Sequence, residues 1–218
     1  MSTPSAPEEL GPTPPAARAV FGERLPMAEA YAASLATDGI TRGLIGPREI
    51  PRIWERHVLN SAVLGEAIAE GARVIDVGSG AGLPGIPLAI ARPDLRVQLL
   101  EPLLRRTTYL EEICGRLGLD AEVVRGRAEE GHIVRALQGA DVVTSRAVAP
   151  LGKLVRWSLP LAKRGGVMQA LKGGSVHEEI ERDGAEIAKA GGGNIAVTEV
   201  GRDVLEAPTH VVTVARVK

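Results

Sequence analysis

Two carboxylic acids and a run of glycines are the residues of this chain with the clearest chemistry. The segment 74–85, VIDVGSGAGLPG, begins as an apolar run, contains Asp76 and then places glycines at Gly78 and Gly80. Glycine permits backbone conformations with φ > 0 and lets a ligand approach the main chain. A second acid, Glu101, ends the next apolar run, where it can accept hydrogen bonds from ribose hydroxyls. We therefore expect these four residues to bind a cofactor that carries an adenosine group.

Two cofactors are compatible with such a loop. Residues 80–85 fit the GxGxxG pattern of dinucleotide-binding loops. The longer string, acid-Val-Gly-x-Gly-x-Gly, fits the first motif of class I S-adenosylmethionine-dependent methyltransferases better. Pro84 and Pro87 remove two backbone amides from the helix start that would hold a pyrophosphate. S-adenosylmethionine has no phosphate, and its ammonium and sulfonium suit a nearby acid such as Asp76. The pattern therefore favours S-adenosylmethionine. The alternative without a function is a glycine-rich turn that binds no ligand.

Strands and helices are predicted to alternate from Arg73 onward, which indicates an α/β fold with a parallel sheet covered on both faces. The predicted strands are 73–77, 96–100, 121–125, 141–145, 166–171, 194–200 and 209–216. The predicted helices between them are 84–92, 103–118, 128–138, 150–163 and 176–190. We expect a Rossmann-like, seven-stranded class I methyltransferase sheet in which the last strand is antiparallel.

The chain before this alternation divides into two parts. Residues 1–17 are rich in Pro, Ser and Ala, and we expect a disordered tail without the features of a signal peptide. Residues 18–70 show helical spacing with a break at 41–47, and predict an N-terminal helical cap. Residues 71–218 would then form the S-adenosylmethionine-binding methyltransferase domain.

The composition excludes several classes of protein. The formal net charge is −1 and aromatic residues make up only 2%, so no global basic field or set of stacking platforms indicates nucleic-acid binding. The single cysteine excludes an internal disulfide and a multi-cysteine zinc site. The histidines lack metal-ligand spacing, and we expect no metal. No run reaches about 20 apolar residues, so we expect no membrane span and a cytoplasmic protein. We also expect a monomer.

The end of the fourth predicted strand, TSRAVAP at 144–150, is where methyltransferases place residues that face the methyl acceptor. The chain lacks the (Asp/Asn/Ser)-Pro-Pro-(Tyr/Phe) box that amino-group methylases commonly carry there. Guanine N7, by contrast, has a free in-plane lone pair and no proton, so its methylation requires positioning and no general base. Arg146 cannot bind N7 during attack, and we expect it to contact the cofactor's carboxylate, a phosphate or guanine O6. No catalytic base is predicted.

Several segments, in order, resemble the bacterial small-subunit rRNA methyltransferase G family, also called glucose-inhibited division protein B. They are RHVLNSAVL (56–64), 74–110, VVRGRAEE (123–130), TSRAVAPL (144–151) and MQALKG (168–173). The LPGIPLAIARP continuation of the glycine loop is far more specific than the loop alone. The matching segments extend over roughly three-quarters of the chain.

The resemblance implies methyl transfer from S-adenosylmethionine to N7 of one guanine, G527 in the 530 loop of 16S rRNA, within the 30S subunit or its precursor. It also implies cofactor contacts at the matching positions, which are Gly78, Leu83, Ala128, Glu129 and Arg146. Glu101 lies where the family has an acid.

RNA would have to be held by local cations, because the chain has no overall positive charge. The candidates are Arg52, Arg56, His57, Arg105, Arg106, Lys153, Arg156 and Lys172. His57 is compatible with either an RNA contact or a structural role beside Trp54 and Leu59.

Three other functions are alternatives to this one. A class I methyltransferase acting on a small molecule would need no ribosomal substrate. A nicotinamide-dependent oxidoreductase is opposed by Pro84 and by the lack of room for a second substrate domain. A non-enzymatic S-adenosylmethionine sensor would bind the cofactor without turnover.

Overall fold

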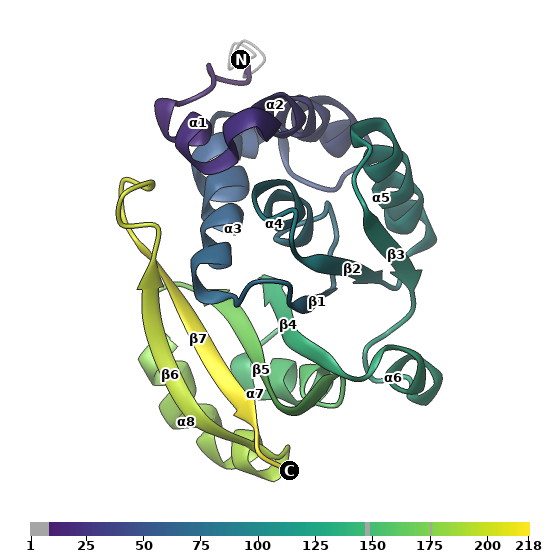
Figure 1. The fold of residues 1–218 in the computed structure, drawn as a ribbon, viewed down its shortest axis with the longest axis vertical. Helices are drawn as coiled ribbons and strands as arrows, with labels where there is room; N and C mark the ends of the chain where they lie inside the picture. The colour runs from purple at the N-terminus through teal and green to yellow at the C-terminus, as the bar shows by residue number, and fades with distance from the viewer. Residues whose placement is uncertain (1–8, 147–148, 175) are drawn as a thin grey trace, which may run out of the picture.

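The computed structural model of the protein describes residues 9–146, 149–174 and 176–218. Its centre is a seven-stranded sheet in the order β3-β2-β1-β4-β5-β7-β6 (Figure 1). The strands are β1 (Arg73–Val77), β2 (Arg96–Glu101), β3 (Ala121–Arg125), β4 (Ala140–Arg146), β5 (Ala162–Lys172), β6 (Gly192–Val200) and β7 (Thr209–Arg216). Strands β1 to β5 pair in parallel, and β7 runs antiparallel to both β5 and β6. The predicted α/β architecture with an antiparallel last strand is confirmed.

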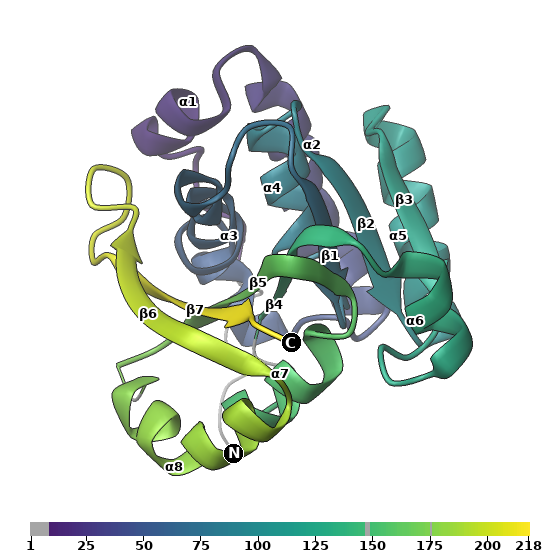
Figure 2. The same cartoon turned by 60° about the horizontal axis from the view of Figure 1, so that its bottom comes forward.

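Helices cover both faces of the sheet, as Figures 1 and 2 show from two directions. They are α4 (Gly85–Ala91), α5 (Leu104–Leu117), α6 (Gly131–Leu137), α7 (Leu151–Ser158) and α8 (Val176–Lys189). The alternation of side chains along β1 separates the two layers. Val74 packs in a core with α4, α5 and the N-terminal helices, whereas Ile75 and Val77 pack in a second core with α6. Helices α7 and α8 pack against β5 and β7 in a third core.

The strand order reverses direction at β1, which pairs with β2 on one side and β4 on the other. In sheets of this kind the loops that leave the two central strands diverge, and ligands bind in the crevice between them. The residues that follow β1 and end β4 are therefore placed to share one site.

The N-terminal helices are part of the main core. Helix α1 (Pro15–Phe21) begins three residues before the boundary expected at residue 18, because Pro15 suits the first turn of a helix. Ala17, assigned from the sequence to a disordered tail, is fully buried. Residues 1–8 of that expected tail lie outside the described residues. Helix α2 (Leu25–Ser34) packs in the same core as α4 and α5, and continues into a π-wound turn, Leu35–Gly39.

The third helical stretch is more irregular than the single helix predicted over 48–70. It has 3₁₀ winding over Pro47–Arg52, π winding over Ile53–Leu59, the short α-helix α3 (Asn60–Ala62) and 3₁₀ winding over Val63–Ala67. Pro51 lies inside the first turn and has no amide to donate, which disfavours regular α-helical bonding there. π-wound turns are frequent at functional sites.

Within the described ranges, none of the helices is both long enough and apolar enough to cross a membrane.

Candidate functional site

The loop between β1 and α4 is shaped by its glycines. Gly78, Gly80 and Gly82 have φ values of 71°, 61° and 97°, a region in which side chains are strained. Gly85 is required for a different reason, since a Cβ there would lie 2.3 Å from Leu99 Cδ2 and 2.8 Å from an Asp76 carboxylate oxygen. The glycines therefore allow the loop to turn tightly and α4 to pack against the sheet.

Asp76 lies behind this loop. Its side chain is fully buried, and Oδ2 accepts hydrogen bonds from Ser79 Oγ at 2.7 Å and from the Gly85 amide at 3.0 Å. Burial raises the pKa of this carboxyl to about 6, while both hydrogen bonds oppose the shift. The sequence predicted a cofactor contact for Asp76, but the residue does not line the cavity described below. Its carboxylate instead accepts the hydrogen bond of the first amide of α4. In a dinucleotide site that amide would bind pyrophosphate.

Glu101 lies on the other side of the loop and is 1% exposed. Its Oε2 accepts a hydrogen bond from the Gly80 amide at 3.0 Å, and its Oε1 accepts one from the Leu103 amide at 3.1 Å. Arg106 Nη1 is 3.7 Å from Oε1. The carboxylate is thus fixed in orientation, and each oxygen keeps a further lone pair for a ligand.

A cavity of about 570 Å³ opens between the glycine loop and the ends of β2 and β4. It is lined by Leu44, Ile45, Gly78, Ser79, Gly80, Ala81, Leu83, Glu101, Pro102, Leu103, Arg106, Arg127 and Arg146. A smaller pocket of about 120 Å³ shares Gly78, Pro102 and Arg127 with it. That pocket is also lined by Ala128, Glu129 and Trp157. The structure thus brings together every predicted site residue except Asp76.

Ala128 and Glu129 lie in the turn before α6, which begins at Gly131 rather than at residue 128 as predicted. Ala128 is buried, whereas the Glu129 residue is exposed. Trp157, from α7, was not predicted as a site residue. No sequence signal singled it out, because its place depends on how α7 packs beside the turn.

The N-terminal elements also contribute to the cavity, which the sequence analysis missed. Tyr31 of α2 donates a hydrogen bond to the Ala81 carbonyl oxygen at 2.8 Å and so supports the glycine loop. Leu44 and Ile45 form part of the cavity wall. Both lie inside the Gly/Pro-bearing break predicted at 41–47, and such a break was the available signal for a loop with a function.

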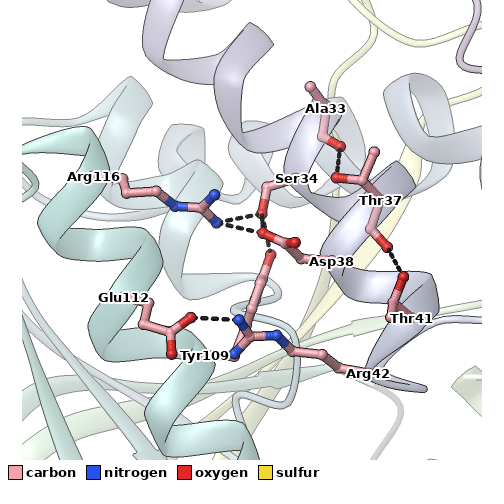
Figure 3. Close-up of polar contacts among 9 residues, drawn as sticks. All are labelled: Ala33, Ser34, Thr37, Asp38, Thr41, Arg42, Tyr109, Glu112 and Arg116. Atoms are coloured by element: carbon pink, nitrogen blue, oxygen red, sulfur yellow. Dashed lines mark hydrogen bonds and ion pairs between the residues drawn. The ribbon is translucent and has the colours of Figure 1, made fainter.

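Polar contacts connect helix α5 with the segment that precedes Leu44 (Figure 3). Arg116 donates to Asp38 at 2.7 Å, and this hydrogen bond lowers the pKa of the Asp38 carboxyl. Arg42 pairs with Glu112, which lies one helical turn before Arg116 on α5. These ion pairs are partly exposed and each is worth little, but together they hold the segment beside the cavity.

Arg146 ends β4 and is held by the third helical stretch. Its Nη1 donates to the Arg56 carbonyl oxygen at 2.9 Å, and its Nη2 donates to His57 Nδ1 at 2.6 Å. His57 is 6% exposed, and its Nε2 lies 2.8 Å from Glu49 Oε2. Of the two roles open to His57, the structure favours the structural one, because the ring is enclosed. Burial lowers the pKa of the Arg146 guanidinium from its usual value.

The other candidate RNA-binding cations differ in exposure. The side chains of Arg52 and Arg56 are 61% and 60% exposed. Arg106 lines the cavity, and Lys172 is 11% exposed and pairs with Glu179 at 2.8 Å.

The remaining candidates lie on two helices. Arg105 is exposed on α5. On α7, Arg156 pairs with Glu186, and Lys153 lies over the Trp157 ring at 4.7 Å. Across the part of the chain that the structure describes, no cluster of three or more His, Cys, Asp or Glu residues could hold a metal ion.

Comparison with known proteins gives consistent results. Residues 24–207 match the family described as rRNA small subunit methyltransferase G. A protein of Corynebacterium jeikeium (strain K411) named ribosomal RNA small subunit methyltransferase G is 68% identical over 210 residues, covering 96% of this chain and 95% of that protein. One of the same name from Mycobacterium marinum (strain ATCC BAA-535 / M) is 53% identical over 205 residues, covering 94% and 90%.

Solved structures resemble the fold at low sequence identity. An S-adenosylmethionine-dependent methyltransferase from Aquifex aeolicus aligns with a TM-score of 0.53 at 20% identity, covering 75% of this chain and 92% of that chain. The neocarzinostatin-biosynthesis O-methyltransferase NcsB1, in complex with S-adenosylmethionine, aligns with a TM-score of 0.59 at 17% identity, covering 86% and 60%. Both likenesses concern the fold.

Proposed function

The chain belongs to the rRNA small subunit methyltransferase G family, and from this premise we propose that it transfers a methyl group from S-adenosylmethionine to N7 of a guanine in the 530 loop of 16S rRNA. The hydrogen bond between the Gly85 amide and Asp76 is the observation that supports this choice of cofactor. The chain's own carboxylate fills the position at which a dinucleotide's pyrophosphate would bind. A cofactor without phosphate groups has no need of that position.

The lining of the two pockets supports a placement for each part of the cofactor. Glu101 accepts hydrogen bonds from the ribose hydroxyls, as acids do at comparable sites. The smaller pocket, with Ala128, Glu129 and Trp157, takes the adenine ring. Arg146 binds the cofactor's carboxylate. Gly78, Gly80 and Leu83 line the same cavity. The cavity of about 570 Å³ is within the usual range for small-molecule sites.

Methyl transfer to guanine N7 fits the groups that line this cavity. S-adenosylmethionine supplies an electrophilic methyl group, and N7 supplies a free lone pair, so no proton has to be removed. The ionisable side chains in the lining are Glu101 and the arginines Arg106, Arg127 and Arg146. Glu101 is already engaged by two loop amides, and an arginine stays protonated. The site therefore suits a reaction accelerated by proximity and orientation.

The rRNA would bind at the mouth of the cavity. Arg56 holds Arg146 through its backbone carbonyl, while its own side chain is 60% exposed. Arg52 in the same helical stretch is also exposed, and the two cations suit contacts with phosphates. We propose that the enzyme acts on the 30S subunit or its precursor as a monomer.

The test uses tritiated S-adenosylmethionine, the purified protein and 30S particles from a strain that lacks this modification. Borohydride–aniline cleavage then maps any N7-methylguanine. Label at one guanine of the 530 loop supports the proposal. Transfer to a small acceptor without rRNA, or tight cofactor binding without any transfer, would overturn it in favour of a small-molecule methyltransferase or a cofactor sensor.

A further inference from the structure

His57 lies between two groups with fixed hydrogen-bonding roles. On one side, the Arg146 guanidinium can only donate, and its Nη2 lies 2.6 Å from Nδ1. On the other side, the ionised Glu49 carboxylate can only accept, and its Oε2 lies 2.8 Å from Nε2. Only one form of the ring satisfies both neighbours, the neutral imidazole with its proton on Nε2 and its lone pair on Nδ1.

We propose that His57 is a positioning residue that holds the guanidinium of Arg146 in the cofactor cavity, and that it does so only in this neutral tautomer. The proposal rests on the proposed function in one respect, the contact between Arg146 and the cofactor. His57 does not line the cavity itself, so its effect passes through Arg146.

The environment of His57 favours the neutral ring. The charged groups that face it are Glu49 from the preceding 3₁₀ turn, Arg56 from its own segment and Arg146 from β4. Burial is the main effect that lowers the His57 pKa below its usual value, and the Arg146 charge adds to it, while Glu49 opposes both. The Glu49 carboxyl has a lowered pKa despite its partial burial, because His57 donates to it and Arg56 and Arg52 lie near. Both shifts favour an ionised Glu49 carboxylate and a neutral His57 ring at pH 7.

Protonation of His57 would reverse its effect on Arg146. A proton on Nδ1 would point at the guanidinium and remove the acceptor, and it would place two positive charges within hydrogen-bond distance. Arg146 would keep only the Arg56 carbonyl as a partner among the described residues. We therefore expect cofactor binding to weaken as the pH falls through the His57 pKa.

The tautomer can be tested without any assay of activity. The chain has four histidines, so the ring nitrogens can be assigned in long-range ¹H–¹⁵N spectra by single substitutions. At pH 7 we expect the Nε2–H tautomer for His57. An Nδ1–H tautomer or a charged ring at pH 7 would overturn the proposal.

The positioning role is tested by two substitutions of similar shape, one with a hydrogen-bond acceptor and one without. His57→Asn keeps an oxygen near the place of Nδ1, and His57→Leu keeps the volume without any acceptor. We expect His57→Leu to weaken the affinity for S-adenosylhomocysteine by about tenfold, a loss typical of one charge-assisted hydrogen bond. His57→Asn should lose less, and its affinity should fall less at acid pH than that of the wild type.

Two controls keep the outcomes distinct. His177→Leu removes an exposed imidazole on α8 and should leave affinity and its pH dependence unchanged. Urea unfolding of each variant separates lost affinity from lost folding. Equal affinity of His57→Leu and the wild type would overturn the positioning role. If the wild-type protein binds S-adenosylhomocysteine but does not methylate 30S particles, the rRNA assignment fails while the role of His57 is still measured.

Discussion

The hydroxyl of Tyr31 donates a 2.8 Å hydrogen bond to the carbonyl oxygen of Ala81, which joins helix α2 to the glycine loop across 50 residues of sequence. Tyr31 is fully buried, and burial raises its pKa well above the usual value, so the hydroxyl keeps its proton and donates. The loop that follows β1 is thus braced by the N-terminal helices. These helices therefore support the candidate cofactor cavity as well as the core.

We predict that Tyr31→Phe destabilises the protein by about 1–2 kcal/mol, since a buried carbonyl loses its donor while the ring stays in place. Cofactor affinity should fall several-fold because Ala81 lines the cavity. Urea unfolding and titration with S-adenosylhomocysteine measure the two effects. Unchanged affinity together with lower stability would show that the brace serves the fold alone.

A second prediction concerns Gly85 at the start of α4. Alanine in a helix is normally favoured over glycine by about 0.5–1 kcal/mol. Here the added Cβ would meet Leu99 and Asp76 at 2.3 and 2.8 Å, and such overpacking typically costs about 1–3 kcal/mol. We therefore expect Gly85→Ala to lower the free energy of unfolding and to weaken cofactor binding.

Gly115→Ala is the matched control for this substitution. Gly115 lies in helix α5, where a Cβ meets nothing within 4 Å. Urea unfolding should show this variant to be as stable as the wild type or more so. A stable Gly85→Ala variant would contradict the role assigned to close packing at the loop.

These positions illustrate what the sequence could predict. The glycines and Glu101 were identified because a strand followed by a glycine loop is a local pattern. Asp76 was identified with them, but its side chain accepts a hydrogen bond from the Gly85 amide and does not line the cavity. The direction of that side chain depends on which face of β1 it lies on. The adjacency of Tyr31 and Ala81 is a tertiary contact, and no local pattern carries it.

The helical stretch around His57 shows the same limit. Its apolar spacing predicted a helix, which is confirmed in outline, but the change from 3₁₀ to π winding was not predicted. Pro51, which has no amide to donate, disfavours regular α-helical bonding in the first of these turns. The hydrogen bond between His57 and Arg146 joins residues 89 positions apart, and so only the fold could reveal it.

The third prediction concerns Asp76 and pH. Its pKa is raised from 3.8 to about 6 in the folded state, so folding favours its protonated form. Its contribution to stability is fully present below pH 3.8 and is lost as the pH rises through about 6. The shift corresponds to on the order of 3 kcal/mol.

Asp76→Asn removes this titration while keeping an oxygen for the Gly85 amide. Measured by urea unfolding between pH 4 and 7, the stability of the wild type relative to the variant should rise as the pH falls. The comparison with the variant removes the contribution of carboxyls that do not interact with Asp76. A constant difference across this range would contradict the raised pKa.

The fourth prediction uses the two tryptophans of the chain. Trp157 lines the smaller pocket, whereas Trp54 is 6% exposed and lines none of the pockets described here. S-adenosylhomocysteine should therefore change the fluorescence of Trp157 alone. Trp54→Phe should retain the ligand-dependent change, and Trp157→Phe should lose it and bind several-fold more weakly. A change that persists in Trp157→Phe would move the adenine ring out of this pocket.

The last prediction concerns Arg146, whose planar guanidinium donates to both the Arg56 carbonyl and His57 Nδ1. Arg146→Ala removes this cation from the cavity, and we expect methyl transfer to 30S particles to fall by about a hundredfold or more, as for the loss of two charge-assisted contacts. The fold should persist, because the side chain lines an open cavity that water can fill. Thermal unfolding of the variant checks this.

Arg146→Lys separates charge from geometry at this position. Lysine keeps the positive charge, but it lacks the planar fork that reaches two fixed acceptors while facing a ligand. If orientation of the guanidinium matters, Arg146→Lys should also be strongly impaired in transfer, with S-adenosylhomocysteine affinity between that of the wild type and Arg146→Ala. Wild-type transfer by Arg146→Lys would mean that charge alone suffices, and wild-type transfer by Arg146→Ala would remove Arg146 from the site.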